Sequence, residues 1–228
     1  DETWLSPAPL ELFVDFETVS NMADDFSRLP LEGGQPLIFQ IGCGWLEGGE
    51  WRFDQWTVDR LDEQSEAAII DAWVARMDGL CRERVITLDE ARIYHWSPAE
   101  TSTLTTAYNA ARVRHPDNGW PDLPWFDLLN EVVKAAPMTV TGAFNYGLKA
   151  IAKAMHEQGH IETQWGDGPT DGLGAMVAAW RVDEAVRDNG GVMLDDALMR
   201  DVADYNRVDC QVMAEILGWL REGEATTR

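Results

Sequence analysis

Leu12-Phe13-Val14-Asp15-Phe16-Glu17-Thr18 places two acids among aromatic and β-branched residues near the start of the chain. This composition predicts a β-strand. Residues two apart on a strand face the same side, so Asp15 and Glu17 project together while Val14 and Phe16 face the other way. Two neighbouring carboxylates on a buried strand repel each other and lose hydration. A divalent cation would compensate this cost, and an edge strand with one solvated face is the alternative.

The composition is that of a globular chain with a strongly acidic balance. The 228 residues are 45% hydrophobic and carry a net charge of −22. No apolar run has the length that a bilayer crossing needs, so no membrane partner is expected. This charge disfavours sequence-independent nucleic-acid binding unless basic residues gather near a site. Cys43, Cys81 and Cys210 show neither CxxC spacing nor an even count, which favours a reducing, cytoplasmic location and argues against structural zinc.

Local patterns predict the remaining elements. Strands are expected at 12–18, 37–45, 51–56 and 92–96, with a Gly48-Gly49 turn between the second and the third. Loops are expected at 18–35 and 116–124, and helices around 69–77 and at 97–114, 127–135, 147–157, 172–187 and 195–221. Three strands with short links predict an antiparallel meander, and the later elements predict a mixed α/β sheet covered by helices. We expect one domain over residues 1–228; because the sequence begins with Asp1 rather than Met, a fragment of a larger protein stays open.

A further acid occurs in Asp204-Tyr205-Asn206-Arg207-Val208-Asp209-Cys210, near the end of the chain. Tyr205 and Asp209 are four residues apart and share one face of the expected helix. Apolar residues continue that face toward the core: Val202, Val212 and Ile216. Asp209 is therefore expected to point inward, where an unpaired acid is costly. A metal ion shared with the acids of the first strand would compensate it; a pair with Arg207 or a hydrogen bond with Tyr205 is the alternative.

Glu100 follows the strand expected at 92–96. Ser97, Pro98 and Glu100 match a capping box at a helix start, which would explain the glutamate without a metal. The position between a strand end and a helix start also commonly presents site residues, and we assign Glu100 as a metal-site acid on that ground. Asp127 is the alternative acid, although a cap before the following helix explains it better.

The order of these acids resembles the DEDD exonucleases of the ribonuclease H-like superfamily. Asp15-Phe16-Glu17 matches the first motif, Asp-x-Glu, and Tyr205-x-x-x-Asp209 matches the third in its tyrosine form. The chain looks most similar to the YprB-like ribonuclease H-like domain attached to predicted RecB-family nucleases. This similarity is carried by Tyr94-His95-Trp96-Ser97-Pro98-Ala99-Glu100, Phe126-Asp127-Leu128-Leu129 and Tyr146-Gly147-Leu148-Lys149-Ala150-Ile151. The second motif of the family usually ends in Asp, and Glu100 stands at that position here.

The resemblance implies a ribonuclease H-like fold and a 3′–5′ exonuclease that hydrolyses single-stranded DNA or RNA with two Mg²⁺ or Mn²⁺ ions. Asp15 would bridge both ions. Glu17 and Asp209 would complete the shell of the first ion, and Glu100 would support the second. Tyr205 would orient the attacking water. The resemblance also implies helicase or RecB-like nuclease domains, in the same or a partner protein, and a role in DNA repair.

Other residues suggest how a substrate would be held. Lys149 and Lys153 share one face of the 147–157 helix in a chain with three lysines, so they could bind phosphates; a solvated helix face is the alternative. Trp96 and Trp165 could offer stacking surfaces for bases.

Two other functions stay open. One is a catalytically inactive docking module in a DNA repair or defence assembly, which the net charge and Glu100 favour. The other is an endonuclease that cuts RNA–DNA hybrids or branched structures with the same acids.

Overall fold

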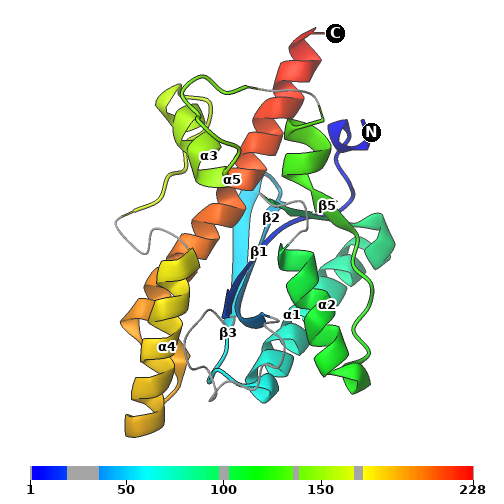
Figure 1. Cartoon of the computed structure of the whole chain (residues 1–228). Coiled ribbons are helices and arrows are strands. Elements are labelled where there is room, and N and C mark those ends of the chain that lie inside the picture. The colour runs from blue at the N-terminus through cyan, green and yellow to red at the C-terminus, as the bar shows by residue number, and fades with distance from the viewer. Residues whose placement is uncertain (1, 20–35, 98–102, 136–138, 167–171, 228) are drawn as a thin grey trace.

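A five-stranded sheet in the order β3-β2-β1-β4-β5 forms the centre of the molecule (Figure 1). The computed structural model describes residues 2–19, 36–97, 103–135, 139–166 and 172–227. The strands are β1 (Glu11–Val19), β2 (Leu37–Glu47), β3 (Glu50–Thr57), β4 (Arg92–His95) and β5 (Trp125–Asp127). The first three pair antiparallel, whereas β4 pairs parallel with β1 and β5 parallel with β4. The predicted mixed sheet with an antiparallel meander is confirmed.

Five α-helices cover this sheet: α1 (Glu63–Arg84), α2 (Thr103–Arg114), α3 (Leu148–Glu157), α4 (Gly172–Asn189) and α5 (Ala197–Thr227). Helices α1 and α2 lie on one face, and α5 crosses the other with α3 and α4 beside it (Figure 1). Shorter helical segments are four 3₁₀ turns (Thr3–Leu5, Leu88–Glu90, Pro116–Asn118 and Met193–Asp195) and the π-helix η4 (Leu129–Val133). None of the helices in the described ranges combines the length and hydropathy that a bilayer crossing requires.

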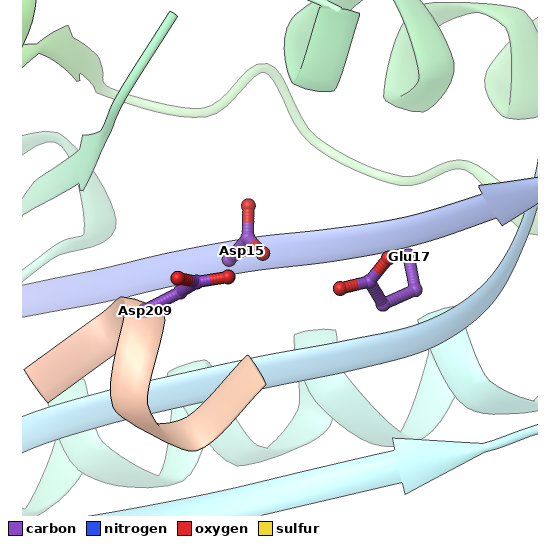
Figure 2. Close-up of side chains that lie close together, drawn as sticks. All are labelled: Asp15, Glu17 and Asp209. Carbon is purple, nitrogen blue, oxygen red and sulfur yellow. The ribbon is translucent and has the colours of Figure 1, made fainter. Parts of the chain in front are cut away.

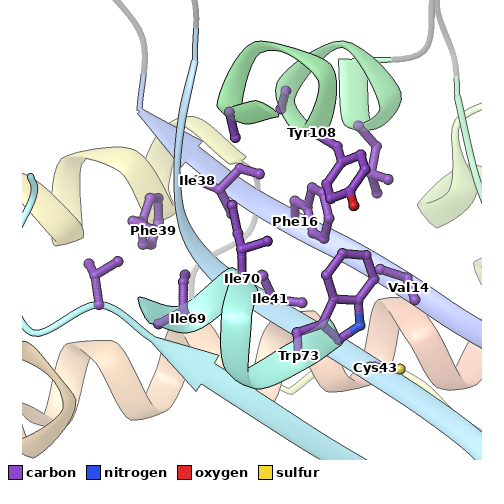
Figure 3. Packing of buried hydrophobic residues seen from close by; sticks show 14 of the residues in the cluster. Val14, Phe16, Ile38, Phe39, Ile41, Cys43, Ile69, Ile70, Trp73 and Tyr108 are labelled. Carbon is purple, nitrogen blue, oxygen red and sulfur yellow. The ribbon is translucent and has the colours of Figure 1, made fainter. Parts of the chain in front are cut away.

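The alternation of β1 divides the core. Val14 and Phe16 face α1 and α2, and the ring of Phe16 meets that of Trp73 edge to face, with centroids 5.3 Å apart (Figure 3). Burying an aromatic side chain of this size contributes about 1.5–3 kcal/mol. Phe13 faces the opposite side and packs in a second cluster with residues of α3 and α5. The odd positions of β1 therefore face α5, as the sequence pattern predicts.

Two backbone features shape the strands around the acids. The β2–β3 hairpin turns at Gly48 and Gly49, whose φ values of +60° and +85° suit the tight two-residue turn. The register of β1 against β2 shifts between Glu17 and Thr18. Such a bulge bends a strand and re-aims its side chains, and here it comes directly after the second acid.

The structure corrects the prediction for residues 116–135. Residues 125–127 form β5, where a loop followed by a helix was expected, because three residues are too few to show an alternating pattern. The segment expected as a regular helix contains the π-helix η4 instead. The first helix is also longer than its apolar pattern predicted, because α1 runs from Glu63 to Arg84. Residues 20–35 and the expected helix start at 98–102 lie outside the described residues.

Candidate metal centre

Three acids converge where α5 crosses the sheet. Asp15 and Glu17 extend from β1 and Asp209 from α5, and one carboxylate oxygen of each lies within 4.8 Å of the other two (Figure 2). We call these residues the acid triad. Glu17 and Asp209 are only 5% and 6% exposed, and Asp15 is half-buried. A donor set made of carboxylate oxygens fits a hard divalent cation such as Mg²⁺ or Mn²⁺.

Burial raises the pKa of all three acids, and the charges of neighbouring acids raise it further for Glu17 and Asp209. Burial raises the pKa of Asp15 from 3.8 to about 7. The pKa of Glu17 rises first through burial and then through the charges of Asp15 and Asp209. The pKa of Asp209 rises through burial and the charge of Asp15, while Lys149 opposes the rise for Glu17 and Asp209. Ionising all three acids is therefore costly, and a bound divalent cation would remove that cost.

Neutral donors orient the acid from α5. The Oδ1 atom of Asp209 accepts a hydrogen bond from Trp165 Nε1 at 3.0 Å, and the hydroxyl of Tyr205, one turn earlier, also bonds to its carboxylate. Burial and the neighbouring acids raise the pKa of Tyr205, so its phenol is protonated at neutral pH. A protonated tyrosine can donate and orient but is a poor base. Arg207, the alternative partner, lies near Asp204 and Gln211.

Asn206 is the site residue that the sequence analysis missed. Its Nδ2 donates to Asp15 Oδ2 at 3.0 Å, and its side chain also bonds to Glu17. Gly42, opposite Asp15 on β2, provides the space, because a Cβ there would lie 1.6 Å from Asn206 Oδ1. A signal was present: Asn206 lies three residues before Asp209, so both occupy the inward face of the helix, where a polar side chain needs a partner.

A cavity of about 360 Å³, which we call the acid cavity, opens over the triad. Tyr205, Lys149 and Trp96 line it together with the three acids. Lys149 Nζ lies 4.3 Å from the ring centroid of Tyr205. Trp96 donates its Nε1–H to the carbonyl oxygen of Tyr146 at 3.0 Å, which holds the indole at the cavity. Lys153 does not line the acid cavity but a neighbouring one.

The fourth acid is not settled by the same geometry. Glu100 lies outside the described residues, so its role stays a prediction. Asp127 accepts hydrogen bonds from the backbone N–H of Asn130 at 3.1 Å and from its Nδ2 at 2.7 Å. These bonds support the capping interpretation of Asp127.

Comparison with protein families agrees with this architecture. A family model described as RNase_H superfamily matches residues 12–221. The matched range extends from β1 into the last turns of α5 and includes the whole acid triad. A comparison with curated proteins finds no match.

Proposed function

Because the chain belongs to the RNase H superfamily, we propose that it is a metal-dependent nuclease that hydrolyses phosphodiester bonds. The observation that carries the proposal is the convergence of the acid triad, with carboxylate oxygens within 4.8 Å of one another. The raised pKa values of the three acids support a cation at this point, since Lys149 is the one basic side chain among the described residues that line the acid cavity.

In this proposal, the acids would bind the metal ions and Tyr205 would orient the attacking water. Asp15, Glu17 and Asp209 would hold two Mg²⁺ or Mn²⁺ ions, with Asp15 shared between them and Glu100 as the further acid. Divalent metal ions lower the pKa of a bound water molecule, which makes it a better nucleophile, and stabilise the leaving oxygen. Tyr205 is protonated and hydrogen-bonds to Asp209, so its hydroxyl would orient the attacking water.

The proposal includes the mode of attack. We infer 3′–5′ exonuclease action on single-stranded DNA or RNA, as in the tyrosine form of the DEDD enzymes. Asp15-x-Glu17 and Tyr205-x-x-x-Asp209 support this inference, together with their positions on β1 and α5.

We also infer the setting of the chain: one YprB-like domain over residues 1–228 that works with helicase or RecB-like nuclease domains in DNA repair. Cys43, Cys81 and Cys210 are buried free thiols, which supports a reducing, cytoplasmic setting.

Hydrolysis of end-labelled single strands tests the proposal directly. With Mn²⁺, a 5′-labelled strand should shorten stepwise, and a 3′-labelled strand should release its labelled nucleotide first.

Asp15→Asn should lower the rate on the order of 10³-fold, because a metal contributes several kcal/mol of transition-state stabilisation. Asp204→Asn is the matched control, since Asp204 lies on the same helix as Asp209 but its side chain is 78% exposed. Cleavage of a circular single strand would indicate an endonuclease, and inertness of the folded protein toward all substrates would overturn the proposal.

A docking module without catalysis is the second candidate function, and the net charge of −22 favours it. Calorimetric titration with Mn²⁺ separates the two. A nuclease should take up two ions in a saturable reaction that Asp15→Asn removes. Weak uptake without a defined stoichiometry, unchanged by Asp15→Asn, would favour the docking module.

A further inference from the structure

A second cavity lies beside the acid cavity and shares Lys149 with it. We call it the distal cavity. It measures about 360 Å³, and its lining includes Lys149, Lys153, His156, Thr163 and Trp165. This volume lies within the range of about 300–1,000 Å³ that is typical of small-molecule sites. None of the acid triad lines it, so the distal cavity needs its own explanation.

The charge at the distal cavity is opposite to that of the chain as a whole. Lys149, Lys153 and His156 are spaced by four and three residues on α3, so they share one face of the helix. The chain has only three lysines against a net charge of −22, and two of them lie at this cavity. Among the described residues that line it, Glu157 is the one acid. A local excess of positive charge in such an acidic chain indicates an anionic ligand.

Trp165 connects the distal cavity to the metal centre. Its ring lines the distal cavity, while its Nε1–H donates to Asp209 Oδ1 at 3.0 Å. Lys149 Nζ lies 5.8 Å from the centroid of the Trp165 ring. A partly buried indole beside Lys149, in a cavity that Lys153 also lines, offers one surface for a flat aromatic group and one for its attached charge. A nucleotide has both groups.

The segment that carries Trp165 is fixed to α5. Glu215 accepts hydrogen bonds from the backbone N–H groups of Glu162 at 2.8 Å and Thr163 at 3.0 Å, and from the Thr163 hydroxyl. The same helix carries Tyr205 and Asp209, so one rigid element positions both the indole and the acid to which it donates. A surface that is ordered before binding loses little conformational entropy when a ligand arrives.

We propose that the distal cavity binds the nucleotide adjacent to the scissile phosphate of a single-stranded nucleic acid, with its phosphate at Lys153 and its base against Trp165. This inference rests on the proposed function, because it takes the acid cavity as the place of hydrolysis. Lys149 then contacts the strand where it passes from one cavity to the other.

Two substrates of different length test the proposal on the chain of residues 1–228. On this proposal, the p-nitrophenyl ester of thymidine 5′-monophosphate should occupy the acid cavity alone, whereas an octathymidylate should also reach the distal cavity. Lys153→Gln should lower kcat/KM for the octathymidylate about 10-fold, the effect of losing one charge-assisted contact, and leave the ester unchanged. Lys153→Arg should restore the rate. Lys134→Gln is the matched control, because Lys134 is the third lysine and bonds to Asn130 away from both cavities.

Binding provides a readout that does not depend on catalysis. The affinity for fluorescein-labelled octathymidylate, measured by anisotropy at several salt concentrations, should show a salt slope reduced by about 0.7 in Lys153→Gln, the value for one phosphate contact to a single strand. The proposal would be overturned if the wild type and Lys153→Gln had equal salt slopes. It would also be overturned if Lys134→Gln reduced the salt slope as much as Lys153→Gln does. If the wild type hydrolyses neither substrate, the nuclease function fails, and the salt slope still decides whether the distal cavity binds the strand.

Discussion

Buried acids occur in two regions of this molecule, and the two regions compensate their charge in different ways. Glu66 on α1 is fully buried and accepts a hydrogen bond from the backbone N–H of Ile38 at 2.8 Å. Its carboxylate also contacts Arg114 Nη2 at 2.7 Å and His115 Nε2 at 3.0 Å. In the acid triad, Glu17 and Asp209 are buried and Asp15 is half-buried, yet the side chains that donate to Asp15 and Asp209 are neutral, and one lysine lines the acid cavity among the described residues. The fold itself balances Glu66, whereas the triad is a cluster of acids that could bind an external cation.

This difference separates a structural acid from a functional one. Burying a carboxylate costs several kcal/mol unless cations and hydrogen bonds replace its water. Glu66 receives both from elements that lie far apart in sequence, so it joins α1, α2 and β2. The triad joins β1 and α5 but carries unbalanced charge. Mutations that neutralise the two groups should therefore change stability in opposite directions.

The largest expected effect is at Glu66. Glu66→Gln should lower the free energy of unfolding by about 3–5 kcal/mol, because it leaves Arg114 buried without its counter-charge. Urea unfolding monitored by tryptophan fluorescence measures the change. Glu83→Gln on the same helix is the control, and its loss should stay below about 1 kcal/mol since Glu83 is exposed and forms only distant ion pairs. Equal losses in both variants would show that the contacts of Glu66 do not distinguish it from a surface acid.

At Asp15 we expect the opposite change, an increase in the free energy of unfolding. Without divalent ions, Asp15→Asn should raise the free energy of unfolding by about 2–4 kcal/mol at pH 8. At this pH the carboxyl group of Asp15 is ionised although burial has raised its pKa to about 7, and the variant removes the cost of that ionisation. Adding Mg²⁺ should stabilise the wild type and not the variant. Thermal unfolding in EDTA and in Mg²⁺ measures both effects, with Asp204→Asn as the exposed control. A destabilised Asp15→Asn in EDTA would place the triad in the same class as Glu66.

A smaller effect, on the affinity for Mn²⁺, is expected when the side-chain amide of Asn206 is removed. Asn206→Ala should weaken Mn²⁺ binding about 10–100-fold, the usual cost of removing a partner that orients a metal ligand. Gly42→Ala should act in the same direction, because its new Cβ would displace the Asn206 side chain. Calorimetry measures both affinities, and Asn189→Ala on α4 is the control. Unchanged binding in Asn206→Ala would mean that the backbone of β1 alone fixes the acids.

The two regions also differ in how far the sequence predicts them. The two-residue period of β1 and the helical period of α5 give the directions of Asp15, Glu17 and Asp209. Their convergence was expected from the cost of burying these acids and from the resemblance to the DEDD exonucleases, and the structure brings them together. The partners of Glu66 lie 48 and 49 residues further along the chain, and only the packing of α1 against α2 brings them together. No local period indicates such a contact.

Two further features show the same limit. The three residues of β5 are a strand because β4 offers hydrogen bonds beside them, which a short sequence window cannot show. Asn206 has the correct helical spacing, but its role depends on Gly42, which lies on a different strand, for the space that its amide occupies. Directions of side chains are thus predictable from local sequence, whereas the fit between elements is not.

The smallest expected effect is on how the free energy of unfolding changes with pH. This dependence reports the charge of the triad and not the packing of its side chains. In metal-free protein, burial raises the pKa of Asp15 from 3.8 to about 7, so between these values the folded chain holds a proton that the unfolded chain releases. The free energy of unfolding should therefore decrease as pH rises through this window, by at most about 1.4 kcal/mol per pH unit for one proton. Urea unfolding in EDTA at several pH values measures the slope. Subtracting the curve of Asp15→Asn cancels the acids outside the triad, and the difference should grow from about pH 4 upward as Asp15 ionises and repels Glu17 and Asp209. Asp204→Asn should keep the slope of the wild type because Asp204 is exposed and the triad is intact in this variant. Parallel curves for wild type and Asp15→Asn would remove the electrostatic distinction between the two regions.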